Sequence, residues 1–262
     1  MKHNNILRTV GAVVCAMVTL TASAQEEGNI TLEQAKHNGW EFEVKAGVNI
    51  GGAAPLSMPR EIRKIESYSP RLNASLEGMA TKWLDEDLKW GISSGLKVEE
   101  KGMITGAQTK GYSMEIIDDG SRVAGYWTGY VKTKYNSTLL TVPLMANYRW
   151  GTAWKVRAGV FMSVKLDGEF SGHVTDGYLR ENNPTGEKIA FTNGKVAAYD
   201  FSTDLRHVLW GAQVGGTWRA YRHFTLNADL TWGFNNIFHK SFKTITFNMY
   251  PIYMNVGFGY TF

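Results

Sequence analysis

The stretch that decides the fold closes the chain: Pro251-Ile252-Tyr253-Met254-Asn255-Val256-Gly257-Phe258-Gly259-Tyr260-Thr261-Phe262. Apolar side chains stand at every second position from 252 to 262, and the residues between them are mostly small or polar. A period of two predicts a β-strand with one apolar face. A terminal strand that ends on an aromatic residue is typical of bacterial outer-membrane barrels. In these barrels the last strand pairs with the first and leaves no open sheet edge.

The same alternation recurs along the chain and predicts eight strands. They cover residues 42–50, 71–81, 88–100, 138–150, 154–165, 207–219, 224–234 and 251–262. Each is about as long as the roughly 9–11 residues with which a tilted strand crosses a bilayer. We therefore predict an all-β fold, an eight-stranded antiparallel up-and-down transmembrane β-barrel that occupies residues 41–262.

The connections between the predicted strands alternate in length. Short ones cover residues 82–87, 151–153 and 220–223, and long ones cover 51–70, 101–137, 166–206 and 235–250. Outer-membrane barrels have tight periplasmic turns and extended outer loops. The alternation therefore predicts that the long connections are extracellular and that both termini are periplasmic.

The N-terminus has the features of a secretory signal peptide. Lys2 and Arg8 form a basic region, residues 10–20 form a short apolar core, and Ala22-Ser23-Ala24 is a small-residue cleavage site. We expect residues 1–24 to be removed and residues 25–40 to form a short periplasmic segment before the barrel. The only cysteine, Cys15, lies in this leader, so no disulfide is expected in the mature chain.

Composition agrees with an outer-membrane location. Aromatic residues make up 13% of the chain, enough for girdles at both membrane interfaces. The formal net charge of +4 falls to +2 without Lys2 and Arg8, which excludes a strongly basic nucleic-acid-binding surface. A soluble β-sandwich or lipocalin-like barrel has the same alternation with the two faces exchanged. The membrane barrel is favoured by the terminal aromatic, the connection lengths and aromatic residues at strand ends such as Trp90, Tyr148 and Trp150.

Several short motifs resemble the PorT-like family of small outer-membrane β-barrels. They are Val-Lys-Ala-Gly-Val-Asn-Ile-Gly at 44–51, Ser-Gly-Leu at 94–96 followed by Lys-Gly at 101–102, Leu-Thr-Val-Pro-Leu at 140–144, Trp-Gly-Phe-Asn-Asn-Ile at 232–237, and Val-Gly-Phe-Gly-Tyr at 256–260. The resemblance covers residues 41–262 and implies an integral barrel without a defined activity; some members serve secretion machinery. It also implies that Phe258, Tyr260 and Phe262 form an assembly signal read by the barrel-insertion machinery.

Charged residues occupy the face opposite the apolar one and are expected to point into the lumen. They are Glu43, Lys45, Arg71, Glu77, Lys97, Glu99, Arg149, Lys155, Arg157, Arg219 and Asp229. The interior of an eight-stranded barrel is just wide enough for side chains. Charges confined there must pair, because an unpaired buried charge is costly. A salt-bridged plug is favoured over an ion-lined pore, since open channels have about sixteen or more strands.

Catalytic signals are weak. His207 and His239 flank strand ends on the outer side, with Asp200 and Asp204 near His207, where a membrane-embedded hydrolase or acyltransferase would hold its groups. No serine or aspartate stands at a persuasive spacing. The sequence also has no glycine-rich phosphate loop and no cysteine or histidine cluster with metal-ligand spacing. We therefore expect a non-enzymatic protein without a cofactor or bound metal.

The long connections are the remaining place for recognition. Tyr112, Tyr126, Trp127, Tyr130 and Tyr135 concentrate in the second one, where exposed aromatics would suit protein or glycan contacts. Alternatively, the strands extend above the membrane and these side chains pack on each other. We expect a structural or surface-interaction role, with outer-membrane lipid and the barrel-assembly machinery as partners. A small pore or transport component and a secretion-associated barrel are the alternatives.

Overall fold

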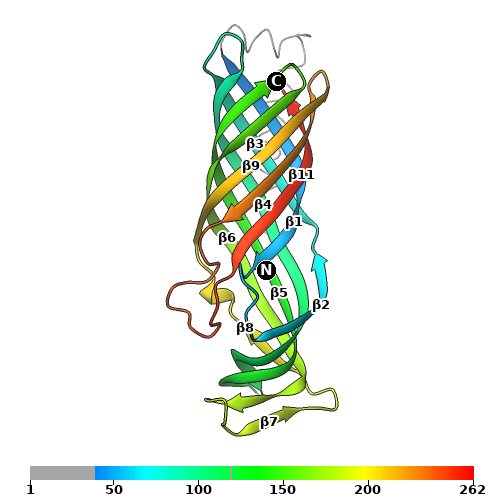
Figure 1. The fold of residues 1–262 in the computed structure, drawn as a ribbon, viewed down its shortest axis with the longest axis vertical. Coiled ribbons are helices and arrows are strands. Elements are labelled where there is room, and N and C mark those ends of the chain that lie inside the picture. Colours follow the sequence, from blue (N-terminus) through cyan, green and yellow to red (C-terminus); the bar gives the residue numbers. More distant parts are fainter. Residues whose placement is uncertain (1–38, 119) are drawn as a thin grey trace.

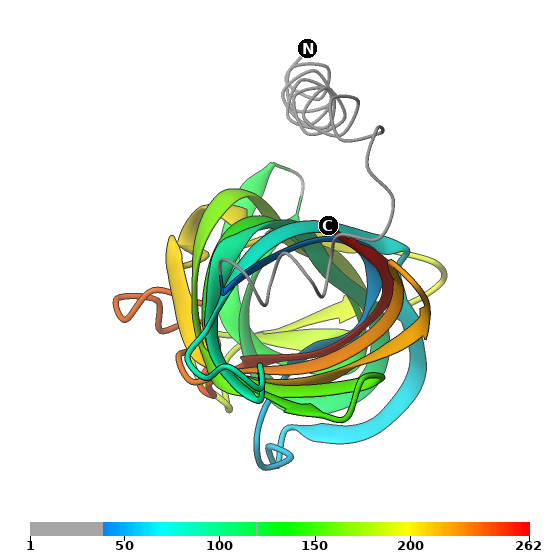
Figure 2. The same cartoon turned by 90° about the horizontal axis from the view of Figure 1, so that it is seen from above.

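The computed structural model describes residues 39–118 and 120–262, so the predicted signal peptide and most of the segment at 25–40 lie outside the described residues. Eight strands pair into a closed ring, whose barrel shape is seen in Figures 1 and 2. They are β1 (Trp40–Ala54), β3 (Asn73–Trp83), β4 (Trp90–Asp118), β5 (Ser121–Trp150), β6 (Trp154–Glu181), β9 (Val208–Tyr221), β10 (Phe224–Gly233) and β11 (Tyr250–Thr261). Each pairs antiparallel with its neighbours, which confirms the predicted eight-stranded barrel.

The ring closes between its first and last strands. β1 and β11 pair antiparallel from Glu43↔Thr261 to Ala54↔Tyr250 without a register shift. Backbone groups that would form two open edges therefore bond to each other, which a strand in lipid requires. Among residues 39–118 and 120–262, no helix is long and apolar enough to cross a membrane.

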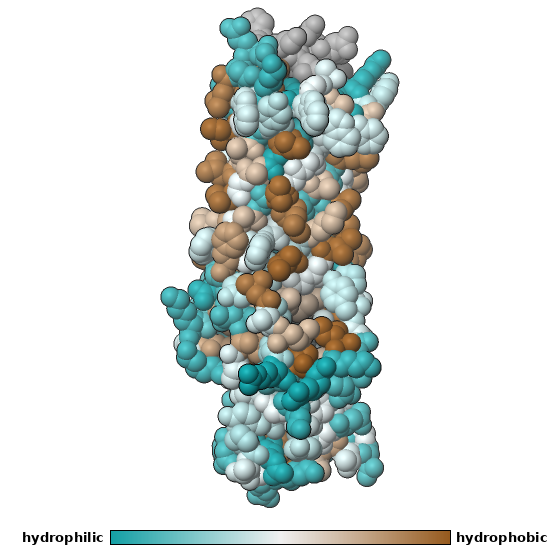
Figure 3. Space-filling view, viewed as in Figure 1, coloured by the Kyte–Doolittle hydropathy of each residue, from teal (hydrophilic) through white to brown (hydrophobic). Residues whose placement is uncertain are grey.

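The two faces of the ring are those that the alternation predicts. Apolar side chains such as Phe42, Leu144 and Val214 are about half exposed on the outside. Figure 3 shows an apolar band of hydrophobic side chains (brown) around the middle of the barrel, between more hydrophilic ends. Polar and charged side chains point inward and are buried. This arrangement suits lipid outside the barrel and hydrogen-bonded side chains within it.

Three of the four long connections that were predicted as loops contain strands, so these three loop predictions are wrong. Residues 101–137 continue β4 and β5, which are 29 and 30 residues long. The connection at 51–70 contains β2 (Ile62–Pro70), which pairs with β4. Within residues 166–206, β6 runs on to Glu181 and is followed by β7 (Lys188–Phe191), β8 (Ala197–Asp200) and the short 3-10 helix η1 (Ser202–Asp204).

These continuations form an extension beyond the apolar band, at the lower end of Figure 1. Within it the apolar residues change sides. Leu140 and Leu144 of β5 face outward, whereas Trp127 and Tyr135 of the same strand are buried inside. Water surrounds the extension, so its apolar residues must turn inward. The point along β5 at which the apolar residues change from the inner to the outer face, called the phase change below, therefore marks the membrane boundary.

The extension has its own hydrophobic core. β8 pairs with β6 through Gly172↔Tyr199 and with β4 through Ile117↔Ala198, so β4, β5, β6 and β8 form a second, narrower ring. Buried residues that share this core include Met114, Ile116, Trp127, Val131, Phe170, Val174, Leu179, Phe191, Tyr199, Phe201 and Phe238. The core caps the end of the barrel lumen from which the extension projects.

Candidate functional site

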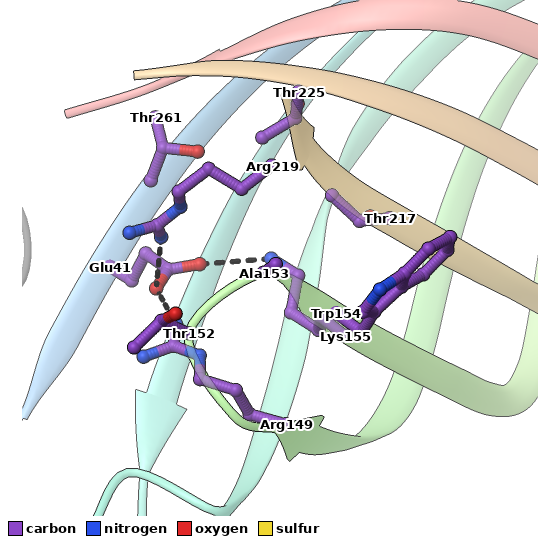
Figure 4. Close-up of a pocket in the computed structure, with 10 residues that line it drawn as sticks. All are labelled: Glu41, Arg149, Thr152, Ala153, Trp154, Lys155, Thr217, Arg219, Thr225 and Thr261. Carbon is purple, nitrogen blue, oxygen red and sulfur yellow. Dashed lines mark hydrogen bonds and ion pairs between the residues drawn. The ribbon is translucent and has the colours of Figure 1, made fainter. Parts of the chain in front are cut away.

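The end of the lumen opposite the extension is organised around Glu41, the second residue of β1. Its carboxylate forms an ion pair with Arg149, lies 2.9 Å from Nζ of Lys155 and lies 4.0 Å from Nη2 of Arg219. Figure 4 shows these groups converging from three parts of the ring. The cavity between them has a volume of only about 10 Å³, roughly that of one water position. It has no room for a substrate.

The middle of the lumen contains two further ion pairs. Arg157 donates two hydrogen bonds to Asp229, one of them from Nε to Oδ1 at 2.7 Å. Lys45 lies 2.9 Å from Glu77. Because the Arg157 guanidinium holds the Asp229 carboxylate at two points, the Arg157–Asp229 pair ties β6 to β10 on the inside of the ring.

The outer part of the lumen is centred on Glu99. Lys97 and Lys101 lie 2.9 Å and 3.1 Å from its two carboxylate oxygens, and Thr141 donates a hydrogen bond to it at 2.9 Å. The Lys101 ammonium also lies 5.2 Å from the ring centre of Phe161 and 5.6 Å from that of Tyr253, both in cation–π range. This cluster joins the polar lumen to the apolar cap above it.

Together these groups form a continuous lumen charge network. Five buried carboxylates (Glu41, Glu43, Glu77, Glu99, Asp229) face six buried cations (Lys45, Lys97, Lys101, Arg149, Lys155, Arg157). Buried amides and hydroxyls fill the space between them; for example, Asn255 donates to Asn49 at 2.8 Å and to Ser75 at 2.7 Å. The near balance of charge and the short contacts describe a filled interior.

Most residues predicted for the lumen are found there. Glu43, Lys45, Glu77, Lys97, Glu99, Arg149, Lys155, Arg157 and Asp229 are buried, and the Arg219 side chain is 15% exposed. Arg71 is the exception and corrects the prediction. It precedes β3, is only half-buried and forms no ion pair within the described part of the chain. It lies two positions before the start of β3, where its charge helps to lower the pKa of Glu169 in the extension.

Two members of the network were missed. Glu41 was assigned to the boundary of the barrel, yet it takes part in the densest cluster. Lys101 was assigned to a loop, because the apolar alternation loses its phase near that position. A signal existed for both, since each continues the inward parity of its strand, with Glu43 and Lys45 after Glu41 and with Lys97 and Glu99 before Lys101.

The terminal aromatics lie at the barrel's closing seam. Phe258 is 62% exposed on the outer face, and the rings of Tyr260 and Phe262 lie 5.0 Å apart. The Phe262 N–H donates to the carbonyl of Phe42 at 2.9 Å, so the final residue still bonds to β1. This geometry places all three side chains on the outward-facing surface toward the end of the barrel opposite the extension.

The two candidate histidines lie together but lack catalytic partners. The rings of His207 and His239 are 5.6 Å apart, and the His239 backbone N–H donates to the carbonyl of Asp204. Across residues 39–118 and 120–262, neither imidazole is hydrogen-bonded to a carboxylate or hydroxyl. The same residues contain no group of three or more histidine, cysteine or acidic side chains that could hold a metal ion.

The aromatic residues at 112–135 are mostly part of the extension's structure. Trp127 and Tyr135 are buried in its core, while Tyr126 and Tyr130 are half-buried. The alternative that the strands extend and pack these rings together is therefore the correct one for Trp127, whose ring contacts Phe191, and for Tyr135, whose ring contacts Phe170.

Polar groups in the extension are also held in place. The Tyr199 hydroxyl bonds to Thr133 at 2.6 Å and to the Lys132 carbonyl at 3.1 Å, and burial raises the pKa of Tyr199. Burial opposes ionisation of Glu169, but hydrogen bonds from Lys134 and Ser171 hold the pKa of that carboxyl below its usual value. At neutral pH the phenol is therefore neutral and the Glu169 carboxylate is charged.

Comparison with known proteins gives one family and several similar folds. The family model described as outer membrane protein beta-barrel domain matches residues 23–239. No curated protein matches the chain. Among solved structures, Ail of Yersinia pestis in complex with the heparin analogue sucrose octasulfate is 10% identical, with 85% of this chain and 99% of that chain covered and a TM-score of 0.37. OprG from Pseudomonas aeruginosa is 12% identical (85% and 95% covered, TM-score 0.36), and the outer membrane protease OmpT from Escherichia coli is 10% identical (86% and 97% covered, TM-score 0.32).

Proposed function

We propose that this chain, which belongs to the outer membrane protein beta-barrel domain family and lies in the bacterial outer membrane, is a non-enzymatic surface protein. Its barrel acts as a closed anchor, and its extension presents a rigid structure outside the cell. The single observation that carries this proposal is the combination of a lumen filled by paired charges with a capped outer end.

The filled lumen argues against a pore or transport component. An ion that entered at the periplasmic end would have to displace Glu41 from Arg149 and Lys155, and then Asp229 from Arg157. Removing one partner of a buried pair leaves an uncompensated charge, at a cost of about 3–5 kcal/mol. Several such steps in series make passive conduction unfavourable.

The orientation follows from the turns. The tight turns at 84–89, 151–153 and 222–223 lie at the end opposite the extension, and short turns of this kind are periplasmic in outer-membrane barrels. The extension then lies on the outside. Its half-buried aromatic residues Tyr126 and Tyr130 supply the contact surface, with a protein or a glycan as the partner.

The finer assignment is to the PorT-like small barrels. The motifs at 44–51, 140–144, 232–237 and 256–260 support it, as does the aromatic terminus. With this assignment we propose that Phe258, Tyr260 and Phe262 are read by the barrel-assembly machinery. We propose no cofactor and no enzymatic role, because His207 and His239 lie together and, among the described residues, no carboxylate or hydroxyl is hydrogen-bonded to either imidazole.

Single-channel recording tests the closed anchor. The refolded full-length protein in a planar bilayer should give no steady conductance at 100 mV in 1 M KCl. The matched variant carries Asp229→Ala and Arg157→Ala together, which removes the central pair without leaving one charge alone, and it should show brief openings. Stable conductance by the unchanged protein would overturn the closed anchor and favour the pore.

A further inference from the structure

The connection between β10 and β11 is an ordered protrusion at the edge of the apolar band. In Figure 1 it is the loop that projects from the side of the barrel between the orange and red strands, and Figure 3 shows hydrophilic atoms on it. The Ile237 N–H donates to the Met249 carbonyl at 3.0 Å, and the Met249 N–H donates to Asn236 Oδ1 at 3.0 Å. Phe238 and Ile245 are buried in the extension's core, so the protrusion has a fixed shape.

A hollow of about 850 Å³ lies between this protrusion and the outer end of β9. Its lining combines three cations with aromatic and amide groups. The residues used below are Arg206, Lys240, Lys243, Trp210 and Phe242. A hollow of this size exceeds what a single small anion needs and is within the range of sites for larger ligands.

The positive charge of the hollow is not neutralised by the protein. Residues 235–249 contain two lysines, one histidine and no acidic residue. Within the part of the chain that the structure describes, Arg206, Lys240 and Lys243 form no ion pair. Arg206 is nevertheless held rigidly, because its guanidinium donates to the carbonyls of Asn236 at 3.0 Å and Phe238 at 3.1 Å. The nearest acidic residue along the chain, Asp204, contacts the protrusion through its backbone carbonyl.

One side of the hollow continues onto the lipid-facing surface. Trp210 of β9 is 52% exposed there, and its ring packs edge-to-face against Phe234 at 5.5 Å. A ligand in the hollow would therefore have cations at one end and an apolar wall, continuous with the bilayer, at the other. A soluble anion would use only the first of these features.

We propose that this hollow binds the phosphorylated headgroup of an outer-leaflet glycolipid. The phosphate would lie against Lys240 and Lys243, and an acyl chain would follow the surface of Trp210. Charge-assisted contacts to phosphate and burial of apolar surface would both favour this ligand over a neutral lipid. The inference rests on the orientation given under the proposed function, but not on whether the lumen is closed.

The experiment measures binding of fluorescent lipid A to the full-length protein in uncharged detergent. The parallel arms are lipid A without its phosphates, inorganic phosphate as competitor, and a sulfated glycan. The test variant is Lys240→Gln with Lys243→Gln, and the matched control is Lys64→Gln with Lys110→Gln, which removes two exposed lysines elsewhere on the extracellular side. A heat-induced gel shift checks that each variant is folded.

The proposal expects at least tenfold weaker binding of lipid A by the Lys240/Lys243 variant and unchanged binding by the control. It also expects at least tenfold weaker binding of the dephosphorylated lipid, and no displacement of lipid A by 5 mM phosphate. Equal losses in both variants, equal binding of both lipids, displacement by phosphate, or binding of the glycan alone would each overturn it. Cysteine labelling of intact cells tests the orientation separately, so failure of the site and failure of the orientation are distinguishable.

Discussion

At the scale of single residues, Glu41 has the largest electrostatic role in the lumen. It neutralises Arg149 and Lys155 and also faces Arg219. Replacing it by glutamine keeps the shape but removes the charge. We expect Glu41→Gln to destabilise the folded barrel by about 3–5 kcal/mol, because buried cations lose their partner. Urea unfolding in lipid vesicles, followed by tryptophan fluorescence, measures the change.

The control for this prediction is Asp87→Asn. Asp87 pairs with Lys89 at 2.8 Å in the turn between β3 and β4, but both side chains are more than half exposed. Solvent screens such a pair, so the variant should unfold at the same urea concentration as the unchanged protein. Similar losses in the two variants would contradict a special role for the buried cluster.

Phe262 allows the assembly signal to be separated from stability. Its deletion removes a half-exposed ring and one backbone hydrogen bond to Phe42, at a cost of at most about 1.5–3 kcal/mol. We expect the deletion variant to refold in detergent almost normally, yet to reach the outer membrane poorly in cells. Quantifying the folded protein in outer-membrane fractions checks this. Normal levels there would refute the assembly role.

The residue scale also shows where sequence reasoning stops. Parity alone indicates which side chains face the lumen, which is why Arg157 and Asp229 could be predicted to point inward. It does not indicate which of them meet, because the pairs join strands as far apart in sequence as Glu41 and Lys155. Parity says less at the ends of strands, because it does not fix where a strand stops. For that reason the sequence predicts Arg71 in the lumen and does not predict Glu41 there.

At the scale of elements, the membrane boundary could not be predicted from alternation. β5 is continuous from Ser121 to Trp150, but its apolar residues change from the inner to the outer face along the way. A change of phase looks like the end of one strand, so residues 101–137 read as a loop. The strand crosses from water to lipid, and the apolar face follows the apolar environment.

One substitution made at two places tests this boundary. Ala158→Arg places a charge on the lipid face of β6, at a cost of roughly 2–4 kcal/mol near the midplane. Ala124→Arg makes the same change at an exposed position of β5 in the extension and should leave stability unchanged. Unfolding in vesicles compares the two. Equal effects would mean that the boundary is drawn in the wrong place.

The extension's core predicts a local failure that spares the barrel. Trp127→Ala removes a fully buried side chain that contacts Phe191 and should cost the extension about 3–5 kcal/mol. Proteinase K added to intact cells should then cut the extension and leave a protected barrel fragment. Tyr126→Ala, at the neighbouring half-buried position, is the control and should resist cleavage.

At the scale of the whole molecule, the orientation can be read with cysteine labels. Ser121→Cys and Glu187→Cys lie at exposed tips of the extension, and Thr152→Cys lies in the turn between β5 and β6. An impermeant maleimide on intact cells should label the first two and not the third. Labelling of Thr152→Cys alone would mean that the barrel has the opposite orientation in the membrane.

The length of β5 has a consequence for what other cells and molecules encounter. Residues 121–135 lie beyond the phase change, and at about 3.3 Å per residue they run some 50 Å along the strand. With strands tilted by about 35–45°, the tip stands roughly 35–40 Å above the lipid. The loop at 235–249, which projects at the edge of the apolar band, would lie near the headgroups. In the proposed orientation, on a bacterium with a dense coat of surface sugars, an antibody or a phage would meet the tips of β4, β5 and β7, and the coat would cover the barrel.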